Sequence, residues 1–142
     1  MAAVAKAKNI APEFRNQKVI ERVVYDFSVD GGATGALDLF TAASDVVLTG
    51  FHAYVKTACT SGGSATVICG VTGTTNAFIT TTTGAVASLT ANAVIPAVVT
   101  EGTPNTFALP RRLASGSKVL MTIGTAALTA GKIEFVLEYM AA

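Results

Sequence analysis

The chain has little charge, no tryptophan and a single histidine, and each shortage excludes a kind of site. Charged residues make up 13% of its 142 residues, against about 25% in a typical soluble domain. Because His52 is the only histidine, one chain cannot form a two-histidine metal site. The surface must therefore be built largely from small polar and apolar residues, which a partner can bury without desolvating many charges.

Long apolar runs and basic blocks are missing as well. The uncharged stretch 57–100 is full of Thr, Gly, Ser and Asn, so it lacks the run of about 20 apolar residues that a membrane helix needs. The net charge is +1 and no basic stripe occurs, so we expect no nucleic-acid partner. Lys6 and Lys8 interrupt the apolar region that a signal peptide would require, so we expect assembly in a cytoplasm rather than Sec export.

The residues that are abundant predict short strands and tight turns. Ala, Thr, Gly and Ser supply nearly half of the chain, and Val is frequent. Thr and Val are branched at Cβ and suit pleated strands, whereas Gly marks turns. The length fits one domain with one core. We therefore predict a single-domain, all-β protein.

The strongest strand signals lie in the first half of the chain. Residues 19–29 alternate, with Val23, Tyr25, Phe27 and Val29 on the buried face and Arg22, Asp26 and Ser28 opposite. A short second strand is predicted over 35–39. A third, over 46–57, places Val47, Phe51 and Val55 on one face and Leu48, His52, Tyr54 and Lys56 on the other. The turn Ser61-Gly62-Gly63 is predicted to join it, as a hairpin, to residues 64–72, where Ala65, Val67, Cys69 and Val71 share a face.

The second half is less regular until its end. Residues 73–110 predict short strands and long loops, with a helix over 84–92 as an alternative. Residues 119–125 and 132–139 are predicted to pair through a turn at Ala130-Gly131, with Ile133, Phe135, Leu137 and Tyr139 inward. About eight strands at this spacing predict a β-sandwich, most plausibly jelly-roll-like, over residues 19–142. Residues 1–18 carry no strand alternation and are predicted to form an extended N-terminal arm.

The two cysteines are expected to be reduced apolar side chains. Cys59 and Cys69 flank the predicted turn, which would leave their sulfurs about four rows, or ~13 Å, apart. A disulfide requires Cα atoms within about 7 Å. We therefore favour two free thiols over a disulfide.

A search for catalytic, cofactor-binding or metal-ligating residues gives none. His52 lies alone on an outward strand position, and no G-x-S-x-G nucleophile motif occurs. The segment 31–35 and the pair Gly131-Lys132 lack the spacing of a phosphate-binding loop. The acidic residues do not converge: four are expected at strand ends and loops (Asp26, Asp30, Asp38 and Asp45), and Glu134 and Glu138 lie ~13 Å apart along a strand. We predict that the protein is not an enzyme and holds no cofactor.

Apolar residues at outward positions instead favour an interaction surface. The candidates are Leu48, Tyr54, Ile68 and Val136. Three stretches (residues 23–40, 60–73 and 125–139) resemble the capsid decoration, or cement, proteins encoded in tailed-bacteriophage head-gene clusters. The resemblance covers about a third of the chain and rests on turn-and-strand motifs.

The resemblance implies a partner and a location. Such proteins have β-sandwich cores that commonly trimerise on the outside of the capsid, so we expect binding to the major capsid protein, a homotrimer and a place in the virion. The basic residues of the arm would then pair with acidic capsid surface. The alternative is a carbohydrate- or receptor-binding β-sandwich of a phage tail or spike, although no Trp and only three Tyr are present.

Overall fold

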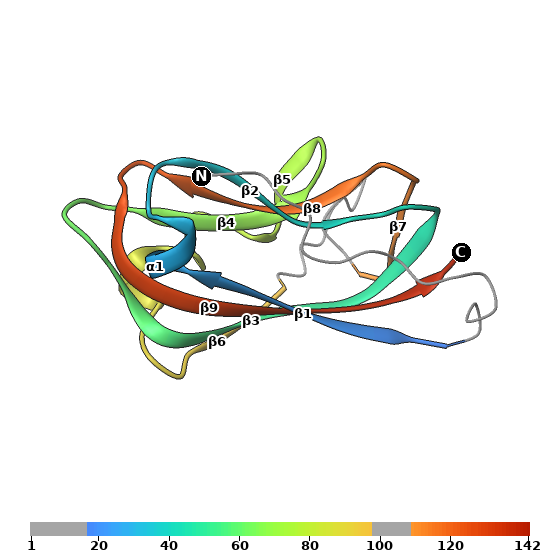
Figure 1. Ribbon diagram of the computed structural model, residues 1–142, viewed down its shortest axis with the longest axis horizontal. Coiled ribbons are helices and arrows are strands. Elements are labelled where there is room, and N and C mark those ends of the chain that lie inside the picture. The colour runs from blue at the N-terminus through green and yellow to red at the C-terminus, as the bar shows by residue number, and fades with distance from the viewer. Residues whose placement is uncertain (1–16, 98–108) are drawn as a thin grey trace.

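The computed structural model describes residues 17–97 and 109–142, which form two facing antiparallel sheets (Figure 1). The described strands are β1 (Val19–Asp26), β2 (Gly35–Thr41), β3 (Val46–Ser61), β4 (Thr66–Val71), β5 (Thr74–Ile79), β6 (Val94–Pro96), β7 (Arg111–Leu113), β8 (Lys118–Gly124) and β9 (Leu128–Ala141). The described helical segments are α1 (Phe27–Asp30) and a 3-10 turn, η2 (Val86–Ser88). The prediction of an all-β sandwich is confirmed.

Most consecutive strands lie in opposite layers, although β4 and β5 share one sheet and β6 and β7 share the other. One sheet has the order β1-β9-β3-β6, with β7 pairing the start of β3, and the other has the order β2-β8-β4-β5. β1 and β2 therefore lie in opposite sheets, as do β8 and β9, whereas β4 and β5 pair with each other within one sheet. We call these the β9 sheet and the β8 sheet after their central strands.

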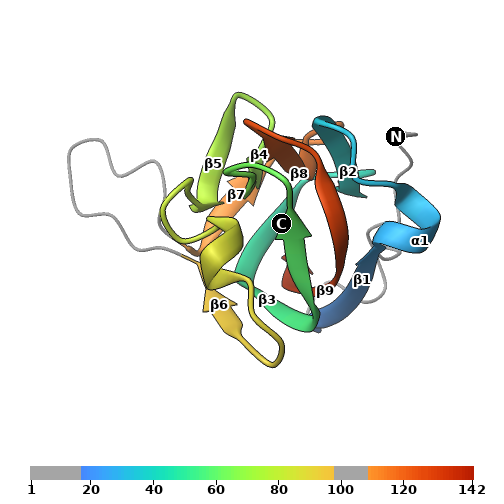
Figure 2. The ribbon, with the colours of Figure 1, turned by 90° about the vertical axis from the view of Figure 1, so that its left-hand side faces the viewer.

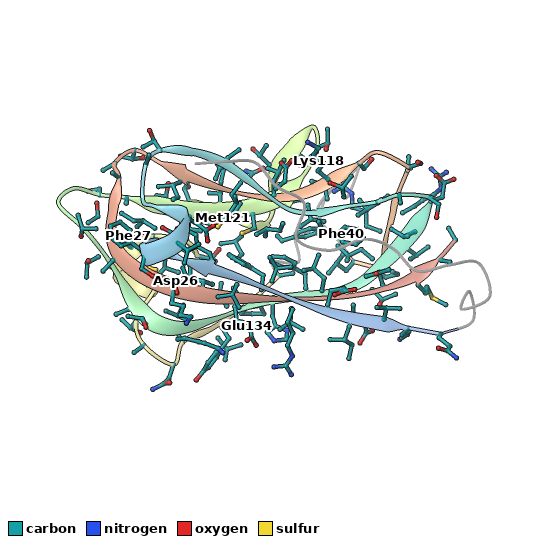
Figure 3. All side chains as sticks on the ribbon, in the orientation of Figure 1. Asp26, Phe27, Phe40, Lys118, Met121 and Glu134 are labelled. Carbon is teal, nitrogen blue, oxygen red and sulfur yellow. The ribbon has the colours of Figure 1, made fainter. Side chains whose placement is uncertain are left out.

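The core lies between the sheets and is closed by aromatic contacts across them. The Phe51 ring of the β9 sheet stacks on Phe78 of the β8 sheet, with centroids 4.9 Å apart. Phe40 and Tyr139 form a second cross-layer pair at the same distance. Figure 3 shows Phe40 and Met121 between the layers, and both are fully buried. The predicted inward residues of the last strand are confirmed: Ile133, Phe135, Leu137 and Tyr139 are each at most 1% exposed.

Both predicted hairpins of the long strands are wrong. β3 and β4 lie in different sheets, so residues 62–65 cross from one layer to the other instead of closing a hairpin. β8 and β9 likewise lie in different sheets, and Ala130-Gly131 lies inside β9 rather than in a turn. The inward face predicted for residues 65–71 is nevertheless confirmed, since Ala65, Val67, Cys69 and Val71 are buried. The alternation of residues 65–71 was visible in the sequence, but the strand that pairs with them was not.

The first strand ends at Asp26, directly before Phe27 and Val29, which were predicted to continue its buried face. Asp26 Oδ1 accepts hydrogen bonds from the Ser28 N–H at 2.9 Å and the Ser28 hydroxyl at 2.7 Å. This cap starts the short helix α1, which places Val29 in solvent with 78% of its surface exposed. Val23 and Tyr25 are buried as predicted, so the alternation holds only to the cap.

A register shift between Leu48 and Gly50 corrects the faces predicted for β3. The ladder with β9 is irregular at this point. Before it, Val46 and Leu48 point inward; after it, Phe51, Ala53 and Val55 do. Leu48 is therefore buried in the core rather than exposed, because an extra residue in a strand moves later side chains to the other face.

The irregular middle of the chain covers an edge of the β8 sheet. β5 and β6 confirm that short strands occur there, and the helix considered for 84–92 is reduced to the η2 turn. The Gly84 carbonyl accepts a hydrogen bond from the Val67 N–H at 2.8 Å, and the Val86 N–H donates to the Ala65 carbonyl at 3.0 Å. Residues 84–86 thus continue the edge that β5 begins. The predicted arm over 1–18 lies almost wholly outside the described residues.

Candidate interaction surfaces

The lone histidine lies in a strand row with apolar neighbours. His52 on β3 is opposite Val136 of β9 on one side and Pro96 of β6 on the other. Within the described residues, no group of three or more His, Cys, Asp or Glu side chains is placed to hold a metal ion. Among the described residues, the strand neighbours directly opposite His52 are thus apolar.

Three of the four clustered aspartates serve the local structure. Asp26 caps α1, and the Ser28 hydrogen bonds lower the pKa of its carboxyl group. Asp30 Oδ2 accepts a hydrogen bond from the Asp26 N–H at 3.0 Å. Asp45 accepts a hydrogen bond from the Ser115 N–H and pairs with the Arg112 guanidinium, and both contacts lower its pKa. These carboxylates hold turns together, as expected for Asp near strand ends.

Asp38 departs from its predicted place at a strand end. It lies within β2, is 7% exposed and forms an ion pair with Lys118 Nζ at 2.6 Å. The two residues are 80 positions apart in the sequence, so local spacing gave no sign of this contact. Figure 3 shows Lys118 on the outer side of the β8 sheet.

Glu134 is the centre of a charged row on the outside of the β9 sheet. Its carboxylate binds Lys56 Nζ at 3.0 Å and Arg22 at 3.2 Å, from the strands on either side of β9. The Lys56 contact is the main cause of its lowered pKa. Glu138 is similarly held by Thr49 Oγ1 at 2.9 Å and Lys18 at 3.4 Å, and these contacts lower its pKa. Glu134 and Glu138 are thus each held by contacts with neighbouring strands or with Lys18.

The outer faces of the two sheets differ in charge. The β9 face carries the Glu134 row, drawn below that sheet in Figure 3. The central positions of the β8 face are Ala36, Thr66, Ile68, Leu120 and Thr122, which are partly or fully exposed. The described ion pair on this face is Lys118 with Asp38. The described part of the β8 face is therefore nearly uncharged, and the predicted outward position of Ile68 holds on it.

An apolar hollow lies at the end of the β8 sheet where the chain crosses between layers. It has a volume of about 280 Å³ and is lined by Gly63, Ser64, Ala65, Thr66, Ala85, Val86 and Ala87. None of these lining residues has a titratable side chain, so the lining provides no acid or base group. The hollow depends on the packing of residues 85–87 against the crossing, which the sequence did not predict.

Both cysteines are buried with free thiols, in different sheets. Burial raises the pKa of the Cys59 thiol to about 11 and that of Cys69 well above its ordinary value. A thiol reacts through its thiolate, so both side chains behave as apolar core residues.

In the described part of the chain, no helix is long and apolar enough to cross a membrane.

Comparisons with known proteins give a structural likeness without a sequence relative. No protein-family model matches the chain, and no curated protein matches it. Among solved structures, a chain of the cyanophage Pam1 capsid asymmetric unit superposes with a TM-score of 0.60 at 15% identity. The match covers 99% of this chain and 98% of that chain. This chain therefore has the fold of a protein found in a phage capsid, the class of particle that the sequence resemblance indicated.

Proposed function

We propose that this chain is a structural protein of a tailed-phage virion that binds the outside of the capsid as a decoration protein. The observation that carries the proposal is the end-to-end likeness to a chain of a phage capsid, since the superposition leaves almost no residue of either chain uncovered. A shared fold alone does not fix a function. The resemblance of residues 23–40, 60–73 and 125–139 to decoration proteins supports the same assignment from the sequence.

The surfaces support a binding role. The described part of the β8 face is nearly uncharged, and a protein partner can cover such a face without leaving buried charges unpaired. Several acidic side chains already have partners within the chain: Asp26 caps α1, and Asp38, Asp45 and Glu134 form ion pairs. These features suit a rigid body that attaches to a lattice and performs no chemistry, with the major capsid protein as its partner.

The described aromatic residues favour capsid binding over the sugar-binding alternative. Tyr25 and Tyr139 are buried, and burial raises the pKa of each to about 12. Tyr54 lies on an outer face, where its hydroxyl donates a hydrogen bond to Asn92 Oδ1. A sugar site normally presents several exposed rings to the sugar faces, so the described surface offers a poor one.

The jelly-roll and trimer assignments belong to the same proposal. The orders β1-β9-β3-β6 and β2-β8-β4-β5 support a jelly roll, because double-sheet jelly rolls interleave strands from both halves of the chain. A trimer is proposed from the resemblance to decoration proteins. Mass photometry of the purified chain tests it: a species of three times the 14.4 kDa chain mass supports it, and a monomer that binds glycans favours the alternative.

A sedimentation experiment tests the function itself. Capsid shells prepared from the same virus without this chain are mixed with the purified protein and pelleted. Saturable co-sedimentation at a fixed ratio to the major capsid protein is expected. The absence of binding to both immature and expanded shells would rule out the decoration role.

Residues 1–18 are proposed to contribute as a basic arm. Deleting them is expected to lower the occupancy of the shells, because Lys6, Lys8 and Arg15 would no longer meet acidic capsid surface. Full occupancy after deletion would show that the sandwich alone makes the contact.

A further inference from the structure

Among the described residues, strand β1 is the longest sheet edge without a register shift. Edge strands expose unpaired backbone groups, and proteins usually protect them with bulges, proline or short length. β6 is three residues long and ends in Pro96, β2 has a register shift between Asp38 and Phe40, and β5 has one between its two pairs with β4. β1 pairs with β9 through eight consecutive residues without a shift. Figure 2 shows β1 and β6 at opposite edges of the β9 sheet.

The hydrogen bonds of β3 identify which backbone groups of β1 point away from the sheet. The backbone groups of Phe51 and Val55 point toward the β6 side. There the Phe51 carbonyl accepts a hydrogen bond from the Ala97 N–H. The Val55 N–H donates to the Ala93 carbonyl, and the Val55 carbonyl accepts from the Asn92 N–H. Their partners on β9, Leu137 and Ile133, therefore bond toward β1, where they face Glu21 and Tyr25.

The odd-numbered residues of β1 are thus hydrogen-bonded to β9, and the even-numbered ones face outward. The Asp26 N–H agrees with this assignment, since it donates to the Asp30 side chain instead of to β9. Ile20, Arg22 and Val24 therefore present their backbone N–H and C=O groups to the open edge.

The side chains beside this edge alternate between basic and apolar. Lys18, Ile20, Arg22 and Val24 share the outer face, and Ile20 is 61% exposed. The side chains of Lys18 and Arg22 are 59% and 70% exposed although each touches a glutamate of β9. A strand added here would meet positive charge at every second position on that face.

This charge pattern disfavours a second copy of β1 as the occupant. An antiparallel pair centred on Ile20 sets Arg22 against Lys18 of the other copy. A pair centred on Arg22 sets the two Arg22 side chains together. Like charges directly opposite one another destabilise a sheet. An extended segment with acidic residues at alternate positions fits the same edge with opposite charges facing.

We propose that the β1 edge binds an extended acidic segment of the capsid subunit by strand addition. The inference rests on the proposed function and adds the site and the chemistry of the partner. Backbone hydrogen bonds to Ile20, Arg22 and Val24 hold the segment, and Lys18 and Arg22 select its acidic side chains. Like charges also disfavour edge-to-edge pairing of two copies, because a pair centred on Glu21 sets the two Glu21 side chains together.

A matched pair of variants tests the site. Ile20 and Val94 are 61% and 60% exposed on opposite edges of one sheet, so Ile20→Glu and Val94→Glu introduce the same charge with similar cost to folding. Binding is measured by co-sedimentation with capsid shells that lack this chain. Ile20→Glu is expected to weaken binding by about tenfold or more and Val94→Glu by less than about twofold, because only the first repels an acidic strand at β1.

Hydrogen exchange followed by mass spectrometry gives a second readout on the wild-type protein. The peptide covering residues 17–26 is expected to gain protection on the shells, because the outward amides of β1 become hydrogen-bonded. The peptide covering β6 is expected to be unchanged. Added salt is expected to weaken binding, since exposed charge pairs are screened.

The outcomes separate this inference from the proposed function. If wild-type protein does not bind shells, the decoration role itself fails. If wild-type protein binds and Ile20→Glu binds equally well, or residues 17–26 gain no protection, only the strand addition is overturned. Equal losses for Ile20→Glu and Val94→Glu, or a change of oligomeric state in free Ile20→Glu, would also overturn it.

Discussion

Replacing Gly84 with alanine is expected to detach the segment that covers the edge of β4. A Cβ atom at Gly84 would lie 1.8 Å from the carbonyl oxygen of Val67 and 2.9 Å from a side-chain carbon of Ile79. The first contact is with backbone, which cannot rotate away as a side chain can. The two chain segments would have to separate by more than about 1 Å to reach an allowed contact.

The magnitude follows from the hydrogen bonds that this separation breaks. The Val67 N–H bond to Gly84 and the Val86 N–H bond to Ala65 are 2.8 and 3.0 Å long, and Val67 is 1% exposed. Leaving a buried donor unsatisfied costs about 1–3 kcal/mol, so Gly84→Ala is expected to lower the free energy of unfolding by about 2–4 kcal/mol. For a domain of this size, that loss lowers Tm by about 8–15 °C.

Gly62→Ala is the matched control, because a Cβ atom there meets nothing within 4 Å. It is expected to change the free energy of unfolding by less than about 1 kcal/mol, with a gain from the stiffer unfolded chain. Urea unfolding followed by circular dichroism measures both variants. Equal stability of Gly84→Ala and Gly62→Ala would refute the packing described for residues 84–86.

Three further predictions concern pH and the core. The pKa values of Asp26 and Glu134 are lowered in the folded state. Their contribution to stability is therefore present above their ordinary pKa values and is lost as the pH falls below about 4. A Tm that stays constant down to pH 2 would contradict this. The pKa values of Tyr25 and Cys59 are raised to about 12 and about 11 in the folded state. Because both groups then ionise more easily in the unfolded chain, Tm is expected to fall as the pH rises above about 9. A constant Tm up to pH 12 would contradict this. Phe51→Ala is expected to cost about 3–5 kcal/mol in urea unfolding, because its ring contacts Phe78 and Phe135; a loss under about 1 kcal/mol would show that the sheets are closed elsewhere.

The sequence allowed most strands to be found but not their partners. Alternation is a property of one strand, so residues 65–71 and 133–139 showed their buried faces directly. Which strands pair depends on contacts between distant residues. A short connection usually joins paired neighbours, and both hairpins predicted on that basis proved to be crossings between sheets.

Two local errors had signals that could have been used. Asp26 followed by Ser28 is a helix-capping pattern, which predicts the end of β1 before Val29. Gly50 inside a strand pattern indicates a bulge, which would have placed Leu48 in the core. The ion pair of Asp38 with Lys118 had no such signal, because it joins residues 80 positions apart. The open β1 edge likewise required the sheet order.

Cryo-electron microscopy of intact virions tests the central claim most directly. The account predicts ordered density for this sandwich on the outer surface of the capsid, at positions repeated by the symmetry of the shell. Virions that lack the chain, or that carry it only in the tail, would contradict the proposed role.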